Sequence, residues 1–266
     1  MSTSFGSCMR CGNWGWVEVV KLAVILASGE GSRLSKVAGR YGKPLVDLFG
    51  FPLIAYPLSS LAAAGISEFI IVANMYNEEL LRERIAELGF RENTIVVVNR
   101  RPGEAGASLI RALEEIGEDN FILSMCDHIY TKEHVERLLA CNEIVCVAGD
   151  KTPRFVEVKE ATKIKTVEEL ARMFSKALST YTYIDTGVFY VSRNARDPIF
   201  DVAVCPECMS LSDIWNQLIS RGYRIGVIDV TGLPWFEVDD EVDYYRSLNG
   251  DRREVVELLL AEFLAR

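Results

Sequence analysis

The alternation of apolar runs with amphipathic segments is the feature that most constrains the fold of this chain. Between residues 22 and 147, five runs of strand length alternate with four segments of helical spacing. The runs cover 22–26, 69–73, 94–98, 121–124 and 144–147, and the helical segments cover 53–64, 78–88, 107–116 and 132–140. Continuous apolar strands separated by helices are typical of a parallel sheet with both faces covered. With right-handed crossovers, the pattern predicts an α/β fold with a doubly wound, mostly parallel, Rossmann-like sheet.

The alternation changes after about residue 150. Residues 154–165 and 181–192 alternate as strands, and a short helix is expected near 167–174, so this part predicts a small antiparallel flap. A helix at 210–220, a strand at 224–230 and an amphipathic end at 254–264 follow. We therefore expect an N-terminal extension at 1–20, a main domain at 21–250 and a C-terminal helix at 251–266.

The composition excludes several classes of protein. Apolar residues make up 49% and charged residues 25%, which is typical of a globular chain, and a net charge of −9 argues against a nucleic-acid partner. No apolar run approaches the roughly 18 residues that span a membrane. The N-terminus lacks a basic start followed by an apolar stretch, so we expect a cytoplasmic enzyme. Gln217 is the single glutamine, a bias reported for hyperthermophile proteins.

The segment after the first predicted strand combines glycines with basic residues. It reads L-A-S-G-E-G-S-R-L and continues to G-K-P-L at residues 42–45. Gly29 and Gly31 allow backbone N–H groups to approach a ligand. Four basic side chains and no acidic one lie from Gly31 to the end of this loop: Arg33, Lys36, Arg40 and Lys43. This local positive charge, at the carboxyl end of a strand, predicts a polyphosphate site; a glycine-rich turn with solvated basic side chains is the alternative.

Two familiar phosphate motifs do not match this loop. The dinucleotide pattern G-x-G-x-x-G fails because Leu34 stands in place of the third glycine, and the Walker pattern fails because Pro44 follows Lys43. What remains, L-A-x-G-x-G-[ST]-R-L followed by G-K-P-L, resembles the signature of the sugar-phosphate nucleotidyltransferase superfamily. The resemblance implies that Arg33 and Lys43 are catalytic. It also implies a set of nucleotide-binding residues: Leu26, Ala27, Ser28, Gly29, Gly31 and Ser32.

Two acidic positions are candidates for a metal. Asp127 follows the strand F-I-L-S-M, and Asp239 follows P-W-F-E-V. Two carboxylates on one sheet edge suit Mg²⁺, which takes few protein ligands plus phosphate oxygens and water. The superfamily resemblance places its metal-binding aspartates at these two positions. Asp127 could instead cap the helix that follows, and Glu237 and Asp240 lie close to Asp239; His128 is expected to be a structural hydrogen-bonding group.

Polar residues further along the chain are candidates for binding an acceptor. They are Arg154 and Lys163, and then Asp185, Thr186 and Gly187 at the start of a predicted strand. Over residues 21–248 the chain resembles the archaeal CTP:inositol-1-phosphate cytidylyltransferases. The resemblance is carried by three segments: D-H-I-Y, P-R-F-V-E-V-x-E-A-T-K-I-K and I-D-T-G-V-F. The resemblance implies that Lys163 holds the acceptor's phosphate and that three residues line the base pocket: Glu104, Gly106 and Ser108.

This resemblance implies CTP and inositol 1-phosphate as substrates and a place in phospholipid biosynthesis. Its members often precede a membrane-embedded CDP-alcohol phosphotransferase domain, so we expect a stand-alone enzyme that works with a separate membrane protein. The loop R-P-G-E-A-G-A-S is shorter than the family's and lacks its asparagine, which leaves another NTP open. Alternatives are a sugar-1-phosphate or molybdopterin nucleotidyltransferase, or a non-catalytic nucleotide-binding regulator.

The seven cysteines are odd in number and accompany no signal-peptide pattern, which argues against a disulfide framework. Four of them form two C-x-x-C pairs: Cys8 with Cys11, and Cys205 with Cys208. These pairs are candidate ligands of a structural Zn²⁺ that would join the N-terminal extension to the C-terminal half. Unligated cysteines, or a disulfide in a thermophile, are the alternatives. The other three are expected in the core: Cys126, Cys141 and Cys146.

Overall fold

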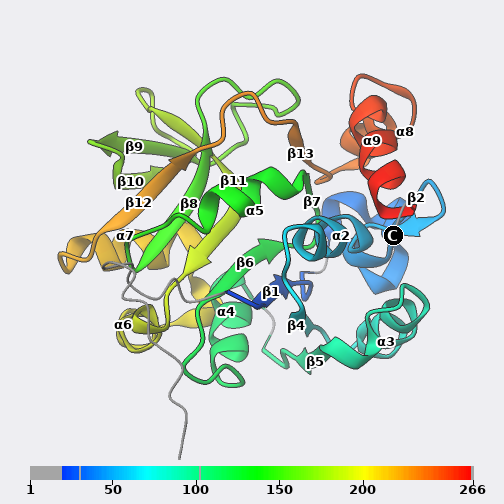
Figure 1. The fold of residues 1–266 in the computed structure, drawn as a ribbon, viewed down its shortest axis with the longest axis horizontal. Helices are drawn as coiled ribbons and strands as arrows, with labels where there is room; N and C mark the ends of the chain where they lie inside the picture. Colours follow the sequence, from blue (N-terminus) through cyan, green and yellow to red (C-terminus); the bar gives the residue numbers. More distant parts are fainter. Residues whose placement is uncertain (1–19, 30, 102, 265–266) are drawn as a thin grey trace, which may run out of the picture.

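The structure, a computed structural model, describes residues 20–29, 31–101 and 103–264 (Figure 1). The expected N-terminal extension therefore lies, apart from Val20, outside the described residues. The described chain forms a nine-stranded sheet in the order β5-β4-β1-β6-β11-β8-β12-β10-β9. In that order the strands are Thr94–Val98, Glu68–Ala73, Leu22–Leu26, Phe121–Met125, Tyr183–Val191, Val145–Asp150, Ile225–Asp229, Leu170–Ser175 and Lys163–Val167.

Most strands of this sheet run in the same direction. β1 pairs in parallel with β4 and β6, β4 with β5, and β8 with β12. β11 is antiparallel to both β6 and β8, and β10 is antiparallel to β12 and β9. Every strand except β11 and β10 therefore shares one direction, which confirms the mostly parallel α/β sheet. β9 also pairs with β11, so the flap end of the sheet curls back on itself.

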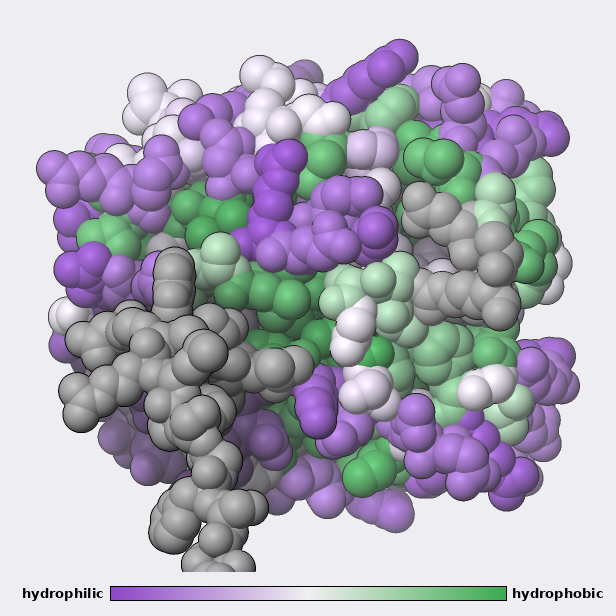
Figure 2. Space-filling view, viewed as in Figure 1, coloured by the Kyte–Doolittle hydropathy of each residue, from purple (hydrophilic) through white to green (hydrophobic). Residues whose placement is uncertain are grey.

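Helices cover both faces of the sheet, because the apolar strands have side chains to bury on each side. One face packs against α4, α6 and α7, and the other packs against α2, α3 and α5. In chain order these helices are α2 Ala55–Ala63, α3 Glu78–Glu87, α4 Ala105–Leu113, α5 Lys132–Leu138, α6 Arg196–Val202 and α7 Leu211–Ser220. On the face drawn in Figure 2, hydrophilic residues form most of the border and hydrophobic residues show mainly toward the middle. No helix in the described ranges is both long and apolar enough to cross a bilayer.

A third apolar cluster lies beside the sheet and supports the loops at its carboxyl edge. It includes residues of α9 (Arg253–Leu264), which contacts α2 and α8 (Glu241–Asn249). Two small ribbons complete this region: β7 (His128–Tyr130) with β13 (Trp235–Glu237), and β2 (Asp47–Leu48) with β3 (Phe51–Pro52). Short helical turns join the main elements: η1 Ser32–Leu34, α1 Ser35–Ala38, η2 Gly39–Tyr41, η3 Lys43–Leu45, η4 Arg91–Asn93, η5 Arg193–Ala195 and η6 Pro206–Cys208.

The flap differs from its prediction in two respects. The strand expected at 154–165 begins only at Lys163, and the helix expected near 167–174 is wrong, because β9 and β10 form a hairpin there. The turn of this hairpin places Glu168 and Glu169 at positive φ, +52° and +57°. Such turns are usually marked by Asn-Gly or Asp-Gly, so this pair of glutamates gave no sequence signal.

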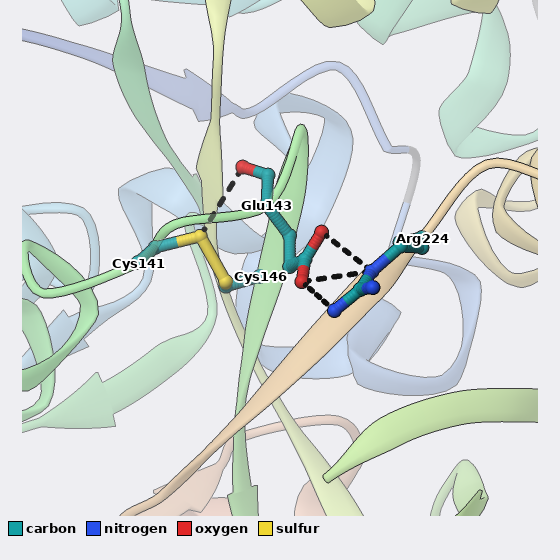
Figure 3. Close-up of a disulfide and its surroundings, with 4 residues drawn as sticks. All are labelled: Cys141, Glu143, Cys146 and Arg224. Atoms are coloured by element: carbon teal, nitrogen blue, oxygen red, sulfur yellow. Dashed lines mark hydrogen bonds and ion pairs between the residues drawn. A yellow bond between two sulfur atoms is a disulfide. The ribbon is translucent and has the colours of Figure 1, made fainter. Parts of the chain in front are cut away.

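The cysteines also depart from expectation, since the described residues contain two disulfides. Cys141, just after α5, bonds to Cys146 on β8 (Figure 3). Beside this bond, the Glu143 carboxylate accepts hydrogen bonds from the Arg224 guanidinium at 2.6–3.1 Å. Both interactions link the entry of β8 to neighbouring elements. Cys126 is buried and free, as expected of a core residue.

The second disulfide joins Cys205 and Cys208 and corresponds to one of the alternatives left open by the sequence. Cysteine binds zinc as a thiolate, so this pair could ligate zinc only after reduction. Cys8 and Cys11, the other half of the candidate zinc site, lie outside the described residues. The four-cysteine zinc site therefore stays a prediction, which metal analysis of the purified protein would test.

One buried histidine makes stability depend on pH. His134 on α5 is fully buried, and its Nε2 has no hydrogen-bond partner within the described residues. Burial lowers the pKa of His134 to about 4, so protonation favours the unfolded chain as pH falls from 6.5 toward that value. We expect His134 to remove up to about 3 kcal/mol of unfolding free energy over this range, at about 1.4 kcal/mol per pKa unit.

Urea unfolding of the wild type and His134→Gln at several pH values between 7 and 4 measures this contribution. The difference between the two proteins removes the effect of the other titrating groups. We expect the wild type to lose stability more steeply than the variant as the pH is lowered. Parallel pH profiles would contradict the assignment.

Candidate active site

The loops after β1 and β6 lie side by side at the carboxyl edge of the sheet. Leu26 pairs with Met125 in the parallel register of the two strands, and the Cys126 amide donates to the Leu26 carbonyl at 3.2 Å. A cavity of about 450 Å³ opens at this edge. Most of the expected phosphate loop lines it: Leu26, Ser28, Gly29, Gly31, Ser32, Arg33 and Lys43. Ala27 does not; it is buried, and Asn77 donates to its carbonyl at 2.9 Å.

The side chain of Lys43 packs directly on Gly31, although twelve positions separate the two residues in the sequence. Gly31 has φ +65°, and a Cβ built on it would lie 2.7 Å from Cγ of Lys43. A larger residue at this position would therefore meet the lysine stem as well as adopt an unfavourable backbone conformation. The loop leaves β1, turns at Gly31 and returns so that Lys43 passes directly over this glycine.

Lys43 lies between the two predicted metal-binding aspartates. Its Nζ donates to Oδ2 of Asp127 at 2.9 Å and also to Oδ1 of Asp239, and Arg33 forms a second ion pair with Asp239. Burial alone would lower the pKa of Lys43, but the charges of Asp127 and Asp239 raise it well above its ordinary value. Burial would likewise raise the pKa of Asp127, but the charge of Lys43 and the hydrogen bond from His128 lower it well below its ordinary value. Lys43 is therefore charged and Asp127 ionised at neutral pH.

The β7–β13 ribbon brings Asp127 and Asp239 together although 112 positions separate them in the sequence. The Val238 amide donates to the Asp127 carbonyl at 2.9 Å, and the Asp239 amide donates to the Asp243 carboxylate at 3.1 Å. Two carboxylates that share one ammonium group present oxygens to a single cation. Within the described residues, no group of three or more His, Cys, Asp or Glu side chains is arranged for a metal. A pair of carboxylates still fits Mg²⁺, which takes further ligands from phosphate and water.

Two of the alternatives weighed for these aspartates can be checked in the structure, whereas Glu237 lines the same cavity as Asp239 and stays an alternative. Thr131 occupies the N-cap position of α5, so Asp127 is not the cap of that helix. Asp240 caps α8 by accepting from the Asp243 amide at 2.9 Å, which excludes it as an equivalent of Asp239.

His128 occupies the hydrogen-bonded position expected for it. Its Nδ1 lies 2.8 Å from Oδ1 of Asp127, its Nε2 lies 3.8 Å from Oε2 of Glu237, and its ring stacks on Trp235 at an interplanar angle of 8°. Burial would lower the pKa of His128, but the hydrogen bond to Asp127 and the charges of Asp127 and Glu237 raise it. His128 thus orients the carboxylate of Asp127 through the oxygen that does not contact Lys43.

A second cavity of about 180 Å³ adjoins the first. The residues that line both cavities include Lys176, His128, Glu237 and Ser210. Only the second cavity is lined by Asp185 and Gly187. Burial raises the pKa of Asp185 to about 6, against the opposing hydrogen bond from the Gly187 amide. The two connected cavities give room for two ligands that meet near Lys176.

Three of the expected acceptor residues lie outside both cavities. Thr186 is fully buried and donates to the Ala148 carbonyl at 3.0 Å. Arg154 lies over the Phe155 ring at 5.0 Å, in a separate hollow beside α9. Lys163 is buried, and its ammonium donates to backbone carbonyls of Lys159, Ala161 and Lys176, the last at 2.6 Å.

The prediction that Lys163 reaches the acceptor is therefore corrected. Strand periodicity placed this lysine on a face but could not show that three carbonyls satisfy its ammonium. Lys176 was missed because the sequence predicted a helix near the segment where β10 forms. Its place in F-S-K-A-L, one residue beyond the strand, was the available signal. Lys163 instead holds the backbone of Lys176, the lysine that lines both cavities.

Two of the three expected base-binding residues lie at the wall of the first cavity. Glu104 and Ser108 line the cavity, and the Ser108 hydroxyl is hydrogen-bonded to Ser28 in the phosphate loop. Asn99 also donates to the Ser108 hydroxyl at 3.3 Å. Gly106 is buried in the first turn of α4 and does not line the cavity.

Comparisons with known proteins agree with this architecture. The family model described as the MobA-like NTP transferase domain matches residues 23–182. A bifunctional IPC transferase and DIPP synthase of Archaeoglobus fulgidus is 33% identical over 88% of this chain and 44% of its own length. The protein of the same name from Thermococcus kodakarensis is 29% identical over 86% and 50%, so the chain spans about half the length of these relatives.

The solved structures show the same fold. That of the inositol-1-phosphate CTP transferase from T. maritima matches with a TM-score of 0.81 and 24% identity, over 90% of this chain and 96% of that one. The family model covers more than half of the chain, and the residues of the phosphate loop, Lys43 and both aspartates lie at one cavity. The chain therefore belongs to the MobA-like NTP transferase family and is a nucleotidyltransferase.

Proposed function

We propose that this chain transfers the cytidylyl group of CTP to inositol 1-phosphate in a Mg²⁺-dependent reaction that releases pyrophosphate. The observation that carries the proposal is the convergence of Arg33, Lys43, Asp127 and Asp239 at one cavity. The names of the relatives, IPC transferase and inositol-1-phosphate CTP transferase, support inositol phosphate and CTP as the substrates.

In this reaction an oxygen of the acceptor's phosphate attacks the α-phosphorus of CTP. A new P–O bond forms while the bond from the α-phosphorus to the oxygen bridging it to the β-phosphorus breaks, and pyrophosphate leaves. A phosphate monoester has a second pKa of about 6 and is largely dianionic at neutral pH, so no side chain needs to remove a proton. Catalysis then depends on holding two anions together and on stabilising negative charge.

The site contains groups suited to both tasks. Arg33 and Lys43 would neutralise the triphosphate and the departing pyrophosphate. Asp127 and Asp239 would hold Mg²⁺, because their carboxylates already converge on one cation. When bound, the metal would supply Lewis-acid stabilisation of charge on the α-phosphate.

The second cavity fits a phosphorylated polyol. Lys176 lines both cavities and would contact the acceptor's phosphate where the two substrates meet. Asp185 and Glu237 offer carboxylate oxygens that can accept hydrogen bonds from ring hydroxyls. The product, CDP-inositol, would be consumed by a membrane CDP-alcohol phosphotransferase.

A screen of pyrophosphate release tests the substrate assignment. The four NTPs would be combined with inositol 1-phosphate and with common sugar 1-phosphates, with Mg²⁺ and with EDTA. We expect the highest kcat/KM for CTP with inositol 1-phosphate and no turnover in EDTA. A preference for a sugar 1-phosphate would favour the sugar-1-phosphate nucleotidyltransferase alternative. A preference for another NTP would mean that the transferred group is not cytidylyl. Absence of release with every pair would contradict the enzymatic proposal itself.

A further inference from the structure

The C-P-E-C segment, residues 205–208, lies directly against the loop expected to bind the nucleotide. The Glu104 amide donates to the Glu207 carbonyl at 2.9 Å, and the Gly106 amide donates to the Met209 carbonyl at 2.9 Å. Glu104 lines the nucleotide cavity, and Gly106 lies in the first turn of the helix that carries Ser108. The wall of the cavity is thus hydrogen-bonded to residues on both sides of Cys208.

The two segments pack backbone against backbone. A Cβ built on Gly106 would lie 2.6 Å from the Met209 carbonyl oxygen and 2.9 Å from that of Pro206. A Cβ on Gly103 would lie 2.8 Å from Cα of Glu207. These distances are shorter than real Cβ contacts, so a shift of the C-P-E-C segment must move the nucleotide loop with it.

The Cys205–Cys208 bond is the covalent constraint on this segment. The segment forms a single 3₁₀ turn, η6, with no buried residue, closed by the Cys208 amide donating to the Cys205 carbonyl at 2.9 Å. Other contacts that hold this turn are those with the nucleotide loop, including the ion pair between Arg101 and Glu207 at 3.4 Å. The disulfide keeps its two ends at a fixed separation.

We propose that the Cys205–Cys208 bond positions the nucleotide-binding loop, so that opening it weakens NTP binding without weakening acceptor binding. This inference rests on the proposed function, which assigns Glu104 and Ser108 to the nucleotide. Opening the bond loosens η6 and with it the two backbone hydrogen bonds that hold Glu104 and Gly106.

The acceptor side is held independently of this bond. Ser210, which lines both cavities, caps α7 through a reciprocal pair of hydrogen bonds with Asp213 at 2.8 and 3.2 Å. Lys176 is held by Lys163 from the flap. The acceptor residues therefore keep their places when η6 loosens, and a change in KM should be confined to the nucleotide.

Kinetics of the full chain before and after dithiothreitol test the proposal. This dithiol reductant is oxidised to its cyclic disulfide while each protein S–S bond gains two electrons and two protons and becomes two thiols. Alkylation and mass spectrometry report the state of each cysteine pair. We expect opening to raise the KM for CTP by about five- to tenfold, the effect of weakening one or two hydrogen bonds. The KM for inositol 1-phosphate and kcat should stay within about twofold.

Two variants assign the effect to one bond. Cys205→Ser/Cys208→Ser should have the raised KM for CTP before and after reduction. Cys141→Ser/Cys146→Ser removes the other disulfide, at the entry of β8, and should respond to dithiothreitol as the wild type does. An unchanged KM for CTP in the first variant, or equal changes in both KM values, would overturn the inference.

A failure of the inference is distinguishable from a failure of the proposed function. Turnover with an unchanged KM for CTP contradicts the inference alone. If no pair of substrates reacts, the proposed function fails, and calorimetric titration of CTP into the open and closed forms still measures the inferred change in affinity. Equal affinities in that titration would contradict it.

Discussion

Replacing Asp127 with asparagine should reduce kcat by about 10³-fold or more, which corresponds to about 4 kcal/mol of transition-state stabilisation. Asparagine keeps the size of the side chain and can still accept a hydrogen bond from His128, which lies 2.8 Å away. It removes the negative charge that shares a cation with Asp239. Steady-state pyrophosphate release over a range of Mg²⁺ concentrations measures both the loss and any weaker dependence on the metal.

Asp229→Asn is the matched control for this change. Asp229 also ends a strand of the sheet, β12, but its carboxylate pairs with Lys151 at 2.7 Å on the surface and does not line the nucleotide cavity. An exposed pair of this kind contributes at most about 1 kcal/mol to stability, so activity should be preserved. Near-wild-type turnover in Asp127→Asn, with the circular dichroism spectrum unchanged, would refute the metal-binding role.

Lys43→Ala should lower kcat/KM by about 10²- to 10³-fold, or about 3–4 kcal/mol. The buried ammonium is held between Asp127 and Asp239 at the cavity wall, where its charge would be available to the triphosphate. Lys43→Met should show a similar loss, because it keeps most of the stem that packs on Gly31 and removes only the charge. Activity close to wild type in the methionine variant would mean that packing alone explains this lysine.

Lys36→Ala provides the comparison within the same loop. Lys36 is exposed, pairs with Glu241 at 3.2 Å and does not line the cavity. Its loss should change kcat/KM by less than about twofold if local contacts, not the total charge of the loop, govern the reaction. A loss as large as that of Lys43→Ala would point to a general electrostatic effect instead.

The sheet was predictable because its central strands are buried on both faces. β1, β4, β5 and β6 are largely apolar runs separated by segments of helical spacing, so the sequence predicted a mostly parallel sheet but not the order of its strands. α8 was not predicted for the converse reason. Its sequence is largely polar and only Ser247 is fully buried in it, so Tyr244 and Leu248, which pack on the third apolar cluster, form too short an apolar stripe to recognise.

The candidate site was predictable where residues follow directly from strand ends. Asp127 succeeds β6 and the phosphate loop succeeds β1, and parallel strands bring such ends together. The acceptor side was predicted only in part: Asp185 and Gly187 line the second cavity, but Lys176 was missed because it follows a hairpin whose turn contains no glycine. The contact between Gly106 and the C-P-E-C segment was also hidden, since it joins backbone atoms about 100 positions apart in the sequence.

Phosphorus NMR of the complete reaction follows the proposed transfer of the cytidylyl group itself. Wild-type protein would be incubated with CTP, inositol 1-phosphate and Mg²⁺, and the spectrum followed over time. We expect the acceptor's monoester signal to disappear as the signals of a diphosphate diester and of free pyrophosphate grow in equal amounts. Release of pyrophosphate with the monoester unchanged, which is hydrolysis of CTP, or no reaction of either substrate, would contradict the proposed transfer.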